Sequence, residues 1–408
     1  MRPIDLLLVF LAFYPVVTGA AWMTGGVIFR LLEEKPAPSA PPGGWPAVTV
    51  LVPAYNEEKV IAGCVTALRE ADYPALEILI LNDGSTDGTV AAARAAAAGD
   101  SRVTVHDDGT NRGKADRLND GMRRARHALV LVTDADTHVH PAAVRYLVVR
   151  MLRSPRYAAI AGSPRVTNRR GLITVMQMLE TASLIGLMRR THALAGRVGT
   201  VAGVLGLFRR DAVLAVGGYD ATMATEDIEL TWRLLQAGHL TGFAPNALVG
   251  MQVPQNLRTL WAQRSRWARG QGEVLRTHLR TVARPRHWPL WPVAAEALLS
   301  YLWVLMLLVA TVYGVIHVIL HPDDAPGFRR MLAWGMGIAV IAMIQVGVAT
   351  AVDLRLDRQL PLACLLLPVY PLAYWTLNAC AALTAQTRGL IGGPRKKRVV
   401  WDIQRTDG

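Results

Sequence analysis

Long apolar runs lie near both ends of the chain, and a polar interval separates them. Residues 6–29 carry no charged side chain, and at about 1.5 Å per helical residue this run is long enough to cross a bilayer core. Three further apolar segments, at about 290–320, 331–352 and 360–385, follow the polar interval. A buried core helix is the alternative for each run, but runs of this length are rare in soluble proteins. We therefore interpret residues 1–33 as a retained transmembrane anchor and residues 290–387 as a C-terminal transmembrane region.

The last apolar segment differs from the others because proline interrupts it at Pro361, Pro368 and Pro371. Such a segment suits an interfacial or re-entrant element as well as a straight span. The basic tail, residues 388–408, bears on the same question. If the polar domain is cytoplasmic and all three segments cross, this tail lies outside, against the positive-inside tendency. The sequence leaves open whether 360–385 crosses fully and on which side the tail lies.

Within the polar interval, short β-branched runs alternate with helical stretches. The runs VTVLVPAY, EILILND, RVTVHD and ALVLVTDAD predict strands between residues 48 and 136, with helices beginning near residues 57, 87, 114 and 141. This alternation predicts an α/β fold with a mostly parallel sheet and helices on both faces. Such sheets bind ligands beyond the carboxyl ends of their strands. The polar residues that fall there are Tyr55, Asn56, Asn82, Asp83, Asp134 and Asp136.

Composition narrows the class of protein. The 408 residues are 52% hydrophobic and 18% charged, which argues against disorder, and the net charge of +13 favours anionic partners such as nucleotides or phospholipid headgroups. The basic residues are dispersed and no RNA-module pattern is present, so nucleic acid is disfavoured. Three scattered cysteines argue against a disulfide framework, a zinc site or an iron–sulfur site, and favour a reducing compartment. The chain has no GxxxxGK[ST] or GxGxxG motif, which weakens ATPase and dehydrogenase interpretations.

Two acidic motifs are candidates for ligand chemistry. Asp134 and Asp136 form a DAD sequence, and side chains two apart in an extended segment point the same way, so both carboxylates can face one Mg²⁺ or Mn²⁺ ion. A solvated turn is the alternative. Asp83 precedes Gly84, where a tight turn would let the carboxylate meet a polar ligand. Its alternative role is to cap the next helix.

Two later motifs supply a candidate base and candidate phosphate and sugar contacts. Glu226 and Asp227 open the stretch EDIELTWRLLQAG, where the helix dipole favours acids, and the functional alternative makes Asp227 a general base. In LWAQRSRWARGQGEV, Gln263, Arg266 and Trp267 lie within about 6 Å of axial rise if helical. Arginine offers a fork of donors to phosphate, and tryptophan a flat face to a sugar ring. An amphipathic helix on the membrane surface explains the same stretch, and both interpretations can hold together.

Six motifs in order, VTVLVPAYNEE, ILNDGSTDGT, GKADRLNDG, LVTDADTHV, ATEDIELTWRL and QRSRW, resemble the family 2 processive glycosyltransferases, which include cellulose, chitin and hyaluronan synthases. Within this group the chain is most similar to bacterial poly-β-1,6-N-acetylglucosamine synthases. TEDIELTW, the stretch SLIGLMRRTHALAGRVGTVAGVLGLFRR and QRSRWARGQGEV carry that resemblance. The single early anchor and the tail sequence KKRVVW also fit, so the resemblance extends over essentially the whole chain.

The resemblance implies a domain organisation and roles for residues. It implies a GT-A-like nucleotide-diphospho-sugar transferase domain at 48–254, after a Pro/Gly-rich linker at 34–47 and before interfacial helices at 255–289. Asp227 and Glu226 would be the catalytic residues, with Asp227 as the base. The donor and acceptor would be bound by Tyr55, Asp83, Lys114, Asp134, Gln263, Arg266 and Trp267. Asp136, with Asp134, would hold Mg²⁺ or Mn²⁺.

The function implied by the resemblance is processive inverting transfer of N-acetylglucosamine from UDP-N-acetylglucosamine to a growing β-1,6-linked polysaccharide, coupled to export. Implied partners are the UDP-sugar, the nascent polysaccharide, the bilayer, a small two-helix membrane subunit, and cyclic di-GMP acting through that subunit. The implied location is the bacterial inner membrane, with a cytoplasmic catalytic domain. Three alternatives stay open: another β-glycan synthase, a transferase that adds one sugar to a lipid carrier, and a membrane scaffold that senses nucleotides.

Overall fold

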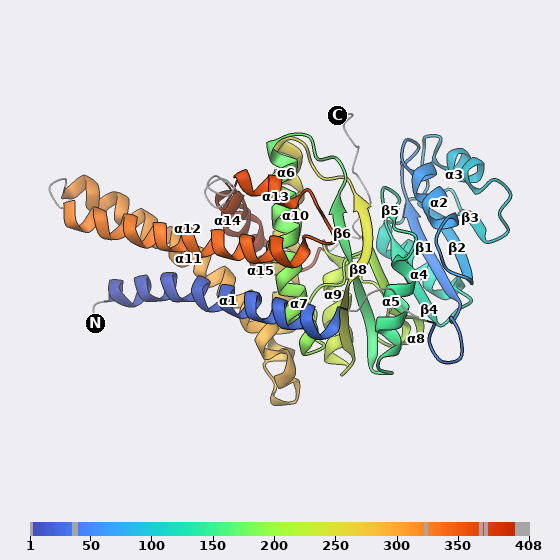
Figure 1. Cartoon of the computed structure of the whole chain (residues 1–408), viewed down its shortest axis with the longest axis horizontal. Coiled ribbons are helices and arrows are strands. Elements are labelled where there is room, and N and C mark those ends of the chain that lie inside the picture. Colours follow the sequence, from blue (N-terminus) through green and yellow to red (C-terminus); the bar gives the residue numbers. More distant parts are fainter. Residues whose placement is uncertain (1–2, 35–39, 322–324, 367–369, 371–373, 396–408) are drawn as a thin grey trace.

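An α/β body carries a single sheet, and long helices project from one side of it (Figure 1). The computed structural model describes residues 3–34, 40–321, 325–366, 370 and 374–395. The predicted basic tail beyond residue 395 and part of the predicted linker lie outside the described residues. The strand order is β3-β2-β1-β4-β7-β6-β8-β5.

The first half of the sheet has the predicted parallel arrangement. Its strands are β1 (Val48–Ala54), β2 (Leu76–Asn82), β3 (Val103–Asp107) and β4 (Leu129–Thr133), and all three pairings among them are parallel. The helices between and after these strands are α2 (Ile61–Arg69), α3 (Thr89–Ala97), α4 (Lys114–Arg124) and α5 (Ala143–Leu152). Strand β1 is buried along its whole length, because helices cover both faces. Val50 and Val52 pack into one apolar cluster and Leu51 into another, on the opposite face.

The second half of the sheet is mixed. Its strands are β5 (His138–Val139), β6 (Tyr157–Val166), β7 (Leu205–Arg209) and β8 (Leu240–Met251). Strand β7 is antiparallel to both β4 and β6, β8 is parallel to β6, and β5 is antiparallel to β8. Two helices follow β7, α8 (Arg210–Ala215) and α9 (Glu226–Gln236). The sequence pattern did not reveal these strands. One of them, β6, reads YAAIAGSPRV and is rich in residues of low strand propensity.

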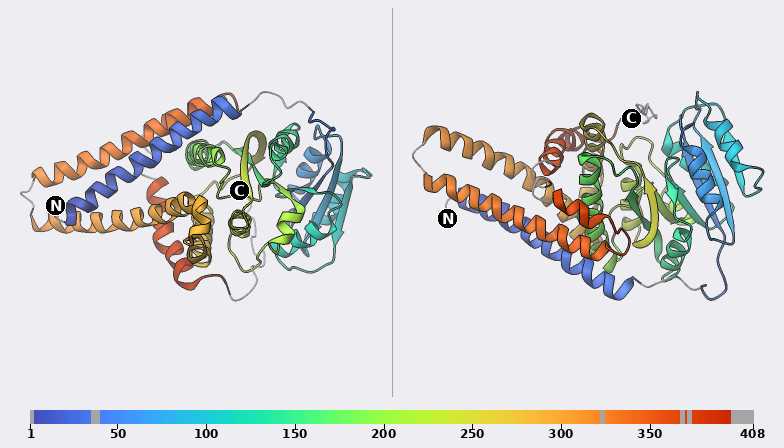
Figure 2. Two further views of the ribbon diagram at one scale, coloured as in Figure 1. Left: turned by 90° about the horizontal axis from the view of Figure 1, so that it is seen from below. Right: turned by 45° about the horizontal axis from the view of Figure 1, so that its top comes forward.

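Three of the predicted apolar segments form long helices: α1 (Pro3–Glu33), α11 (Trp291–Leu320) and α12 (Ala325–Asp353). They extend away from the body in the same direction (Figures 1 and 2). Within the described residues, Leu6–Glu33, Pro285–Leu320 and Gly335–Asp353 are long and apolar enough to cross a membrane. In each, at most 33% of the most apolar window is buried, which leaves most of that surface available to lipid.

A fourth segment of spanning length, Leu172–Leu194, was not anticipated from the sequence. It consists of α6 (Leu172–Glu180), the π-helix η1 (Thr181–Gly186) and α7 (Leu187–Leu194). Its most apolar window is 65% buried, about twice the highest value among the other three. The segment therefore packs mainly against protein.

The predicted segment at 360–385 is broken into short pieces, as its prolines suggested. The described pieces are α13 (Leu360–Ala363), the 3₁₀ turn η3 (Cys364–Leu366), α14 (Thr376–Ala381) and the π-helix η5 (Ala382–Gln386), and α15 (Thr387–Gly392) follows. Pro368 and Pro371 lie outside the described residues. No helix of spanning length occurs in the part of this segment that the structure describes.

Helix α10 (Leu257–Val282) joins the body to the apolar helices, and the 3₁₀ helix η2 (Pro285–Leu290) leads from it into α11. Asn256 caps α10, because its side-chain oxygen accepts a hydrogen bond from Thr259 N at 2.9 Å. Gly272 of α10 lies against the backbone of Gln386, where a Cβ atom would overlap the carbonyl oxygen. Glycine at this point allows the close contact between α10 and the C-terminal helices.

Buried charges connect α1 and α12 to the body. Arg190 of α7 pairs with Glu34, just after α1, at 2.6 Å and with Asp353, at the end of α12, at 2.6 Å. Arg165 of β6 pairs with the same Asp353 at 2.7 Å. The side chains of Arg190, Glu34 and Asp353 are at most 1% exposed. We call Glu34, Arg165, Arg190 and Asp353 the junction cluster.

Candidate active site

Asp83, which follows β2, organises the loop that leads into α4. Its carboxylate is fully buried and accepts hydrogen bonds from Arg112 N and Gly113 N, both at 2.8 Å. Arg117 of α4 donates through Nε to the same carboxylate at 2.8 Å. The capping alternative is wrong: Asp87, and not Asp83, accepts from Thr89 N at the start of α3. Asp83 therefore fixes the position of the residue after Gly113, which is Lys114.

Lys114 reaches across the carboxyl edge of the sheet to Asp134, which follows β4. Its Nζ lies 2.5 Å from Asp134 Oδ1 and 3.9 Å from Glu226 Oε1. Gly203, just before β7, faces this pair, and a Cβ atom there would lie 2.9 Å from Lys114 Nζ. The absence of a side chain at Gly203 thus leaves room for the lysine.

The two acids of the TED sequence begin α9 at the same edge. Asp227 Oδ2 accepts a hydrogen bond from Gly203 N at 3.2 Å, and Oδ1 accepts from Ile228 N at 2.9 Å. Both donors are backbone amides, and one belongs to the first turn of the helix, where a negative charge is stabilised. Asp227 is only partly buried. A carboxylate held by backbone amides in this way has a fixed orientation from which it can receive a proton.

The charges at this edge interact strongly. Burial acts to lower the pKa of Lys114, but Asp134, Glu226 and Asp227 outweigh it, so the pKa is raised and the ammonium stays charged. Burial raises the pKa of Glu226, Lys114 lowers it and Asp227 raises it, with a net increase. Burial together with Glu226 and Asp227 also raises the pKa of Tyr219 well above its ordinary value, so this phenol stays protonated. One fixed positive charge therefore lies among three acids.

Asp136 and Tyr55 lie at the same edge of the sheet, both partly exposed. Tyr55 follows β1 directly, and the next residue, Asn56, has a positive φ of 54°. The expectation that Asp134 and Asp136 share an extended segment is wrong. Strand β4 ends at Thr133, and Thr137 closes a turn by donating through Oγ1 to the Asp134 carbonyl at 2.7 Å. The alternation rule for strands does not apply inside this turn.

Helix α10 brings the QRSRW sequence to the beginning of α9. Gly270 of α10 contacts Thr225, where a Cβ atom would overlap the threonine side chain. Arg266 is exposed and lies close enough to lower the pKa of Glu226. Gln263 presents a buried Oε1 that has no hydrogen-bond partner among the described residues. Gln263 Oε1 can therefore accept a new hydrogen bond, and the exposed Arg266 can donate to an anion.

Trp267 is held by a residue that the sequence analysis did not single out. The guanidinium of Arg264 lies 4.4 Å from the centre of the Trp267 ring and 5.5 Å from that of Tyr374. Arg264 also pairs with Glu180 of α6 at 2.7 Å and donates to the Tyr374 hydroxyl at 2.5 Å. Its side chain is 7% exposed. Arg264 thus connects Trp267 to α6 and to the broken C-terminal segment.

The structure brings most of the predicted residues to one edge. Direct contacts connect Asp83, through the loop at Gly113, to Lys114, Asp134 and, through Gly203, to Asp227. Sequence reasoning missed Gly203, Arg117, Tyr219 and Arg264. Arg117 and Arg264 lie inside the GKADR and QRSRW motifs, so their position was a usable signal. Gly203 and Tyr219 belong to no charged motif, and only the fold shows their place.

Comparison with known proteins identifies the family. A family described as "Glycosyltransferase like family 2" matches residues 46–270, which include every residue of the edge just described. The chain belongs to glycosyltransferase family 2. Two relatives in this family are the poly-β-1,6-N-acetyl-D-glucosamine synthases of Staphylococcus aureus (strain COL) and Staphylococcus epidermidis. They are 33% and 30% identical over 388 residues, which cover 93% of this chain and 94% of each relative.

The fold of this glycosyltransferase also occurs in a solved structure. The mannosyltransferase PcManGT of Pyrobaculum calidifontis, determined in complex with GDP-mannose and Mn²⁺, superposes with a TM-score of 0.65. That alignment covers 93% of this chain and 99% of the mannosyltransferase, at 21% identity. The predicted GT-A-like fold is thereby confirmed, and the family assignment favours an enzyme over a nucleotide-sensing scaffold.

The donor atoms at the edge suit a hard divalent cation. Mg²⁺ in phosphate-transfer sites is commonly held by one or two carboxylates together with substrate phosphates. Asp134 and Asp136 offer two carboxylates, while no group of three or more His, Cys, Asp and Glu side chains able to hold a metal occurs within the described ranges. A metal bound through these two residues would therefore need substrate oxygens to complete its shell.

Proposed function

We propose that this glycosyltransferase builds a β-1,6-linked poly-N-acetylglucosamine by repeated inverting transfer from UDP-N-acetylglucosamine. The observation that supports the proposal best is the contact series from Asp83 through Lys114 and Asp134 to Asp227, beside the middle of α10. The names of the relatives, which cover nearly the whole chain, support the sugar and the linkage.

In this proposal the donor lies along the carboxyl edge of the sheet. Tyr55 and the loop held by Asp83 border the nucleotide, while Lys114 and Arg266 approach the diphosphate with positive charge. Asp134 and Asp136 would hold Mg²⁺ or Mn²⁺, which offsets the negative charge of the departing diphosphate. Gln263 and Trp267 bind the acceptor end of the chain. Glu226 keeps Lys114 and Arg266 in place through its charge.

The chemistry is a single displacement at the anomeric carbon. Asp227 takes the proton of the acceptor hydroxyl as that oxygen forms its bond to the anomeric carbon. The bond between this carbon and the diphosphate oxygen breaks, and UDP leaves with the electron pair. Lys114 and Arg266 stabilise the charge that develops on UDP. Attack from the face opposite to the leaving group converts an α-linked donor into a β-linkage.

The apolar helices would export the product in the same proposal. A polar polymer crosses hydrocarbon only along a protein-lined path. We place the protein in the bacterial inner membrane with residues 48–254 as a cytoplasmic transferase domain, 255–289 at the interface and 290–387 in the membrane. A small two-helix subunit, with cyclic di-GMP acting through it, is the proposed regulatory partner. The sequence resemblance is what supports that partner.

The test uses the purified full-length protein in nanodiscs with a panel of UDP-sugars and either Mg²⁺ or Mn²⁺. We expect UDP release and a long polymer with UDP-N-acetylglucosamine only, and loss of both when EDTA removes the metal. The Asp227→Asn variant should lose on the order of 10²-fold or more in rate while it binds UDP as the wild type does. Products of a single added sugar would refute processivity, and a wild-type rate in the variant would refute the role of Asp227.

A further inference from the structure

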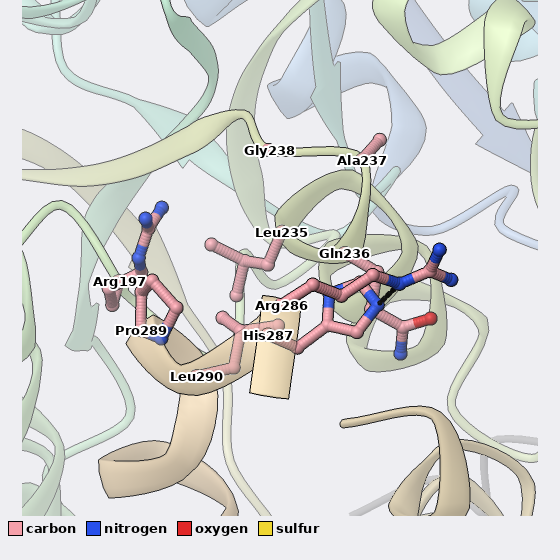
Figure 3. A pocket seen from close by; sticks show the side chains of 9 residues that line it. All are labelled: Arg197, Leu235, Gln236, Ala237, Gly238, Arg286, His287, Pro289 and Leu290. Atoms are coloured by element: carbon pink, nitrogen blue, oxygen red, sulfur yellow. Dashed lines mark hydrogen bonds between the residues drawn. The ribbon is translucent and has the colours of Figure 1, made fainter. Parts of the chain in front are cut away.

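A cavity lies away from the catalytic edge, at the C-terminal end of α9, where the body meets the apolar helices. It has a volume of about 370 Å³ and is formed by the end of α9, by Arg197, which follows α7, and by η2 (Figure 3). Arg197 stands on one side, and Arg286 and His287 of η2 stand on the other. Pro289 and Leu290 supply an apolar floor.

The charge around this cavity is positive and largely unneutralised. Arg197 and Arg286 line the cavity, Arg156 donates to Gly238 O at its rim at 3.4 Å, and Arg284 lies just ahead of η2. In the part of the chain that the structure describes, none of these four guanidinium groups has a carboxylate within 4.0 Å. Elsewhere in the body arginines are commonly paired, as Arg117 is with Asp83.

Backbone carbonyl groups compensate only part of this positive charge. Arg197 donates to His239 O at 2.9 Å, close to the end of α9, where carbonyl groups carry partial negative charge. Burial and the nearby Arg156 lower the pKa of Arg197, and burial with Arg286 and Arg284 lowers the pKa of His287. Burial is the larger cause of both shifts, and the neighbouring guanidinium groups add to it.

The cavity lies at the depth where lipid headgroups are expected. Helix η2 ends at Leu290, and α11, with lipid-accessible residues along its length, begins at the next residue. Trp288 and Trp291 beside the cavity are 67% and 46% exposed, and exposed tryptophan is enriched at membrane interfaces. Basic pockets next to transmembrane helices are a recurrent form of anionic headgroup site.

We propose that this cavity binds the phosphate group of an anionic membrane lipid, held between Arg197 and Arg286. The lipid tails then lie along the first turns of α11, over Trp288 and Trp291. The ligand also fixes the end of α9, the helix that carries Glu226 and Asp227 at its other end. A phosphate on a soluble molecule has the same charge chemistry but no acyl chains to place against α11.

The test measures lipid binding, so its outcome does not depend on the proposed enzymatic activity. Phosphatidylglycerol is titrated into the purified full-length protein in a neutral detergent, and bound lipid is counted by native mass spectrometry. We expect saturable binding, about fivefold weaker in Arg286→Gln and in Arg197→Gln and about 25-fold weaker in the double variant. Arg286 is exposed, so its variant should fold even if Arg197→Gln, which also loses the bond to His239 O, does not.

The matched control is Arg280→Gln, which removes an exposed arginine near the end of α10 that does not line the cavity. It should bind phosphatidylglycerol as the wild type does. Zwitterionic phosphatidylcholine should bind far more weakly, and excess inorganic phosphate should not displace the bound lipid. Equal binding of both lipids, displacement by inorganic phosphate, or full binding in Arg286→Gln would each overturn the proposal.

Discussion

Replacing Arg264 by methionine would remove the charge that holds Trp267, Glu180 and Tyr374 together. The Glu180 carboxylate, which is 10% exposed, loses the Arg264 guanidinium at 2.7 Å. It keeps the hydrogen bond that the Tyr374 hydroxyl donates at 3.0 Å. Removing one partner of a buried ion pair typically lowers the free energy of unfolding by about 3–5 kcal/mol. The lost contact with the Trp267 ring adds about 0.5–2 kcal/mol, since the cation is desolvated.

The matched variants separate charge from positioning. In Arg264→Met/Glu180→Gln both charges are gone, and we expect the thermal unfolding temperature in nanodiscs to return close to that of the wild type. Trp267 still lacks its cationic support in this double variant. We therefore expect shorter polymers at an undiminished rate of UDP release per chain end, because the acceptor is held less well between additions. Arg264→Lys, which keeps the charge but not the planar group, should give intermediate lengths.

Polymer length is measured on gels and UDP release in a parallel assay for the wild type and each variant. If the double variant regains the unfolding temperature and also makes polymers of wild-type length, Arg264 is a structural residue only. If UDP release falls in parallel with length in every variant, the network acts on chemistry and not on the acceptor. Either outcome would refute the role assigned to Arg264.

Two further predictions concern the sheet edge and Cys64. Gly203→Ala puts a methyl group 2.9 Å from Lys114 Nζ, so we expect a higher KM for the donor in steady-state kinetics. The control Gly392→Ala, whose methyl group would have no atom within 4 Å, should have the KM of the wild type. Equal KM values for the two variants would show that Lys114 moves aside without cost. Burial raises the pKa of Cys64 to about 12, so we expect a maleimide to leave Cys64 intact until the protein unfolds, as peptide mass spectrometry would report. Labelling of Cys64 in the folded protein would contradict its burial.

The sequence predicted those parts of the fold that local pattern determines. Strands β1 to β4 are β-branched runs followed by helices, so their pairing in a parallel sheet followed from pattern alone. Strand β6 contains Ala, Gly, Ser and Pro at positions that are all buried, and its pairing with β7 and β8 decides its conformation. Propensity gives no signal when neighbours across the sheet supply the stabilisation.

The candidate site was predictable in its acids and not in its geometry. Asp83 was expected to meet a ligand or cap a helix, whereas its carboxylate accepts two loop amides and Arg117. The turn at Asp134 depends on Thr137, which the extended interpretation ignored. Contacts between residues far apart in sequence, such as Arg264 with Glu180, depend on tertiary structure and have no local signature.

The junction cluster restricts the relative movement of the helices and the strand that it joins. Glu34, Arg190, Asp353 and Arg165 make α1, α12, α7 and β6 share buried charges, and separating any one of them strands an ion in a dry environment. We therefore expect these four elements to move together as one rigid unit. In the proposed export, we expect the movement that advances the product by one sugar to occur outside these four elements.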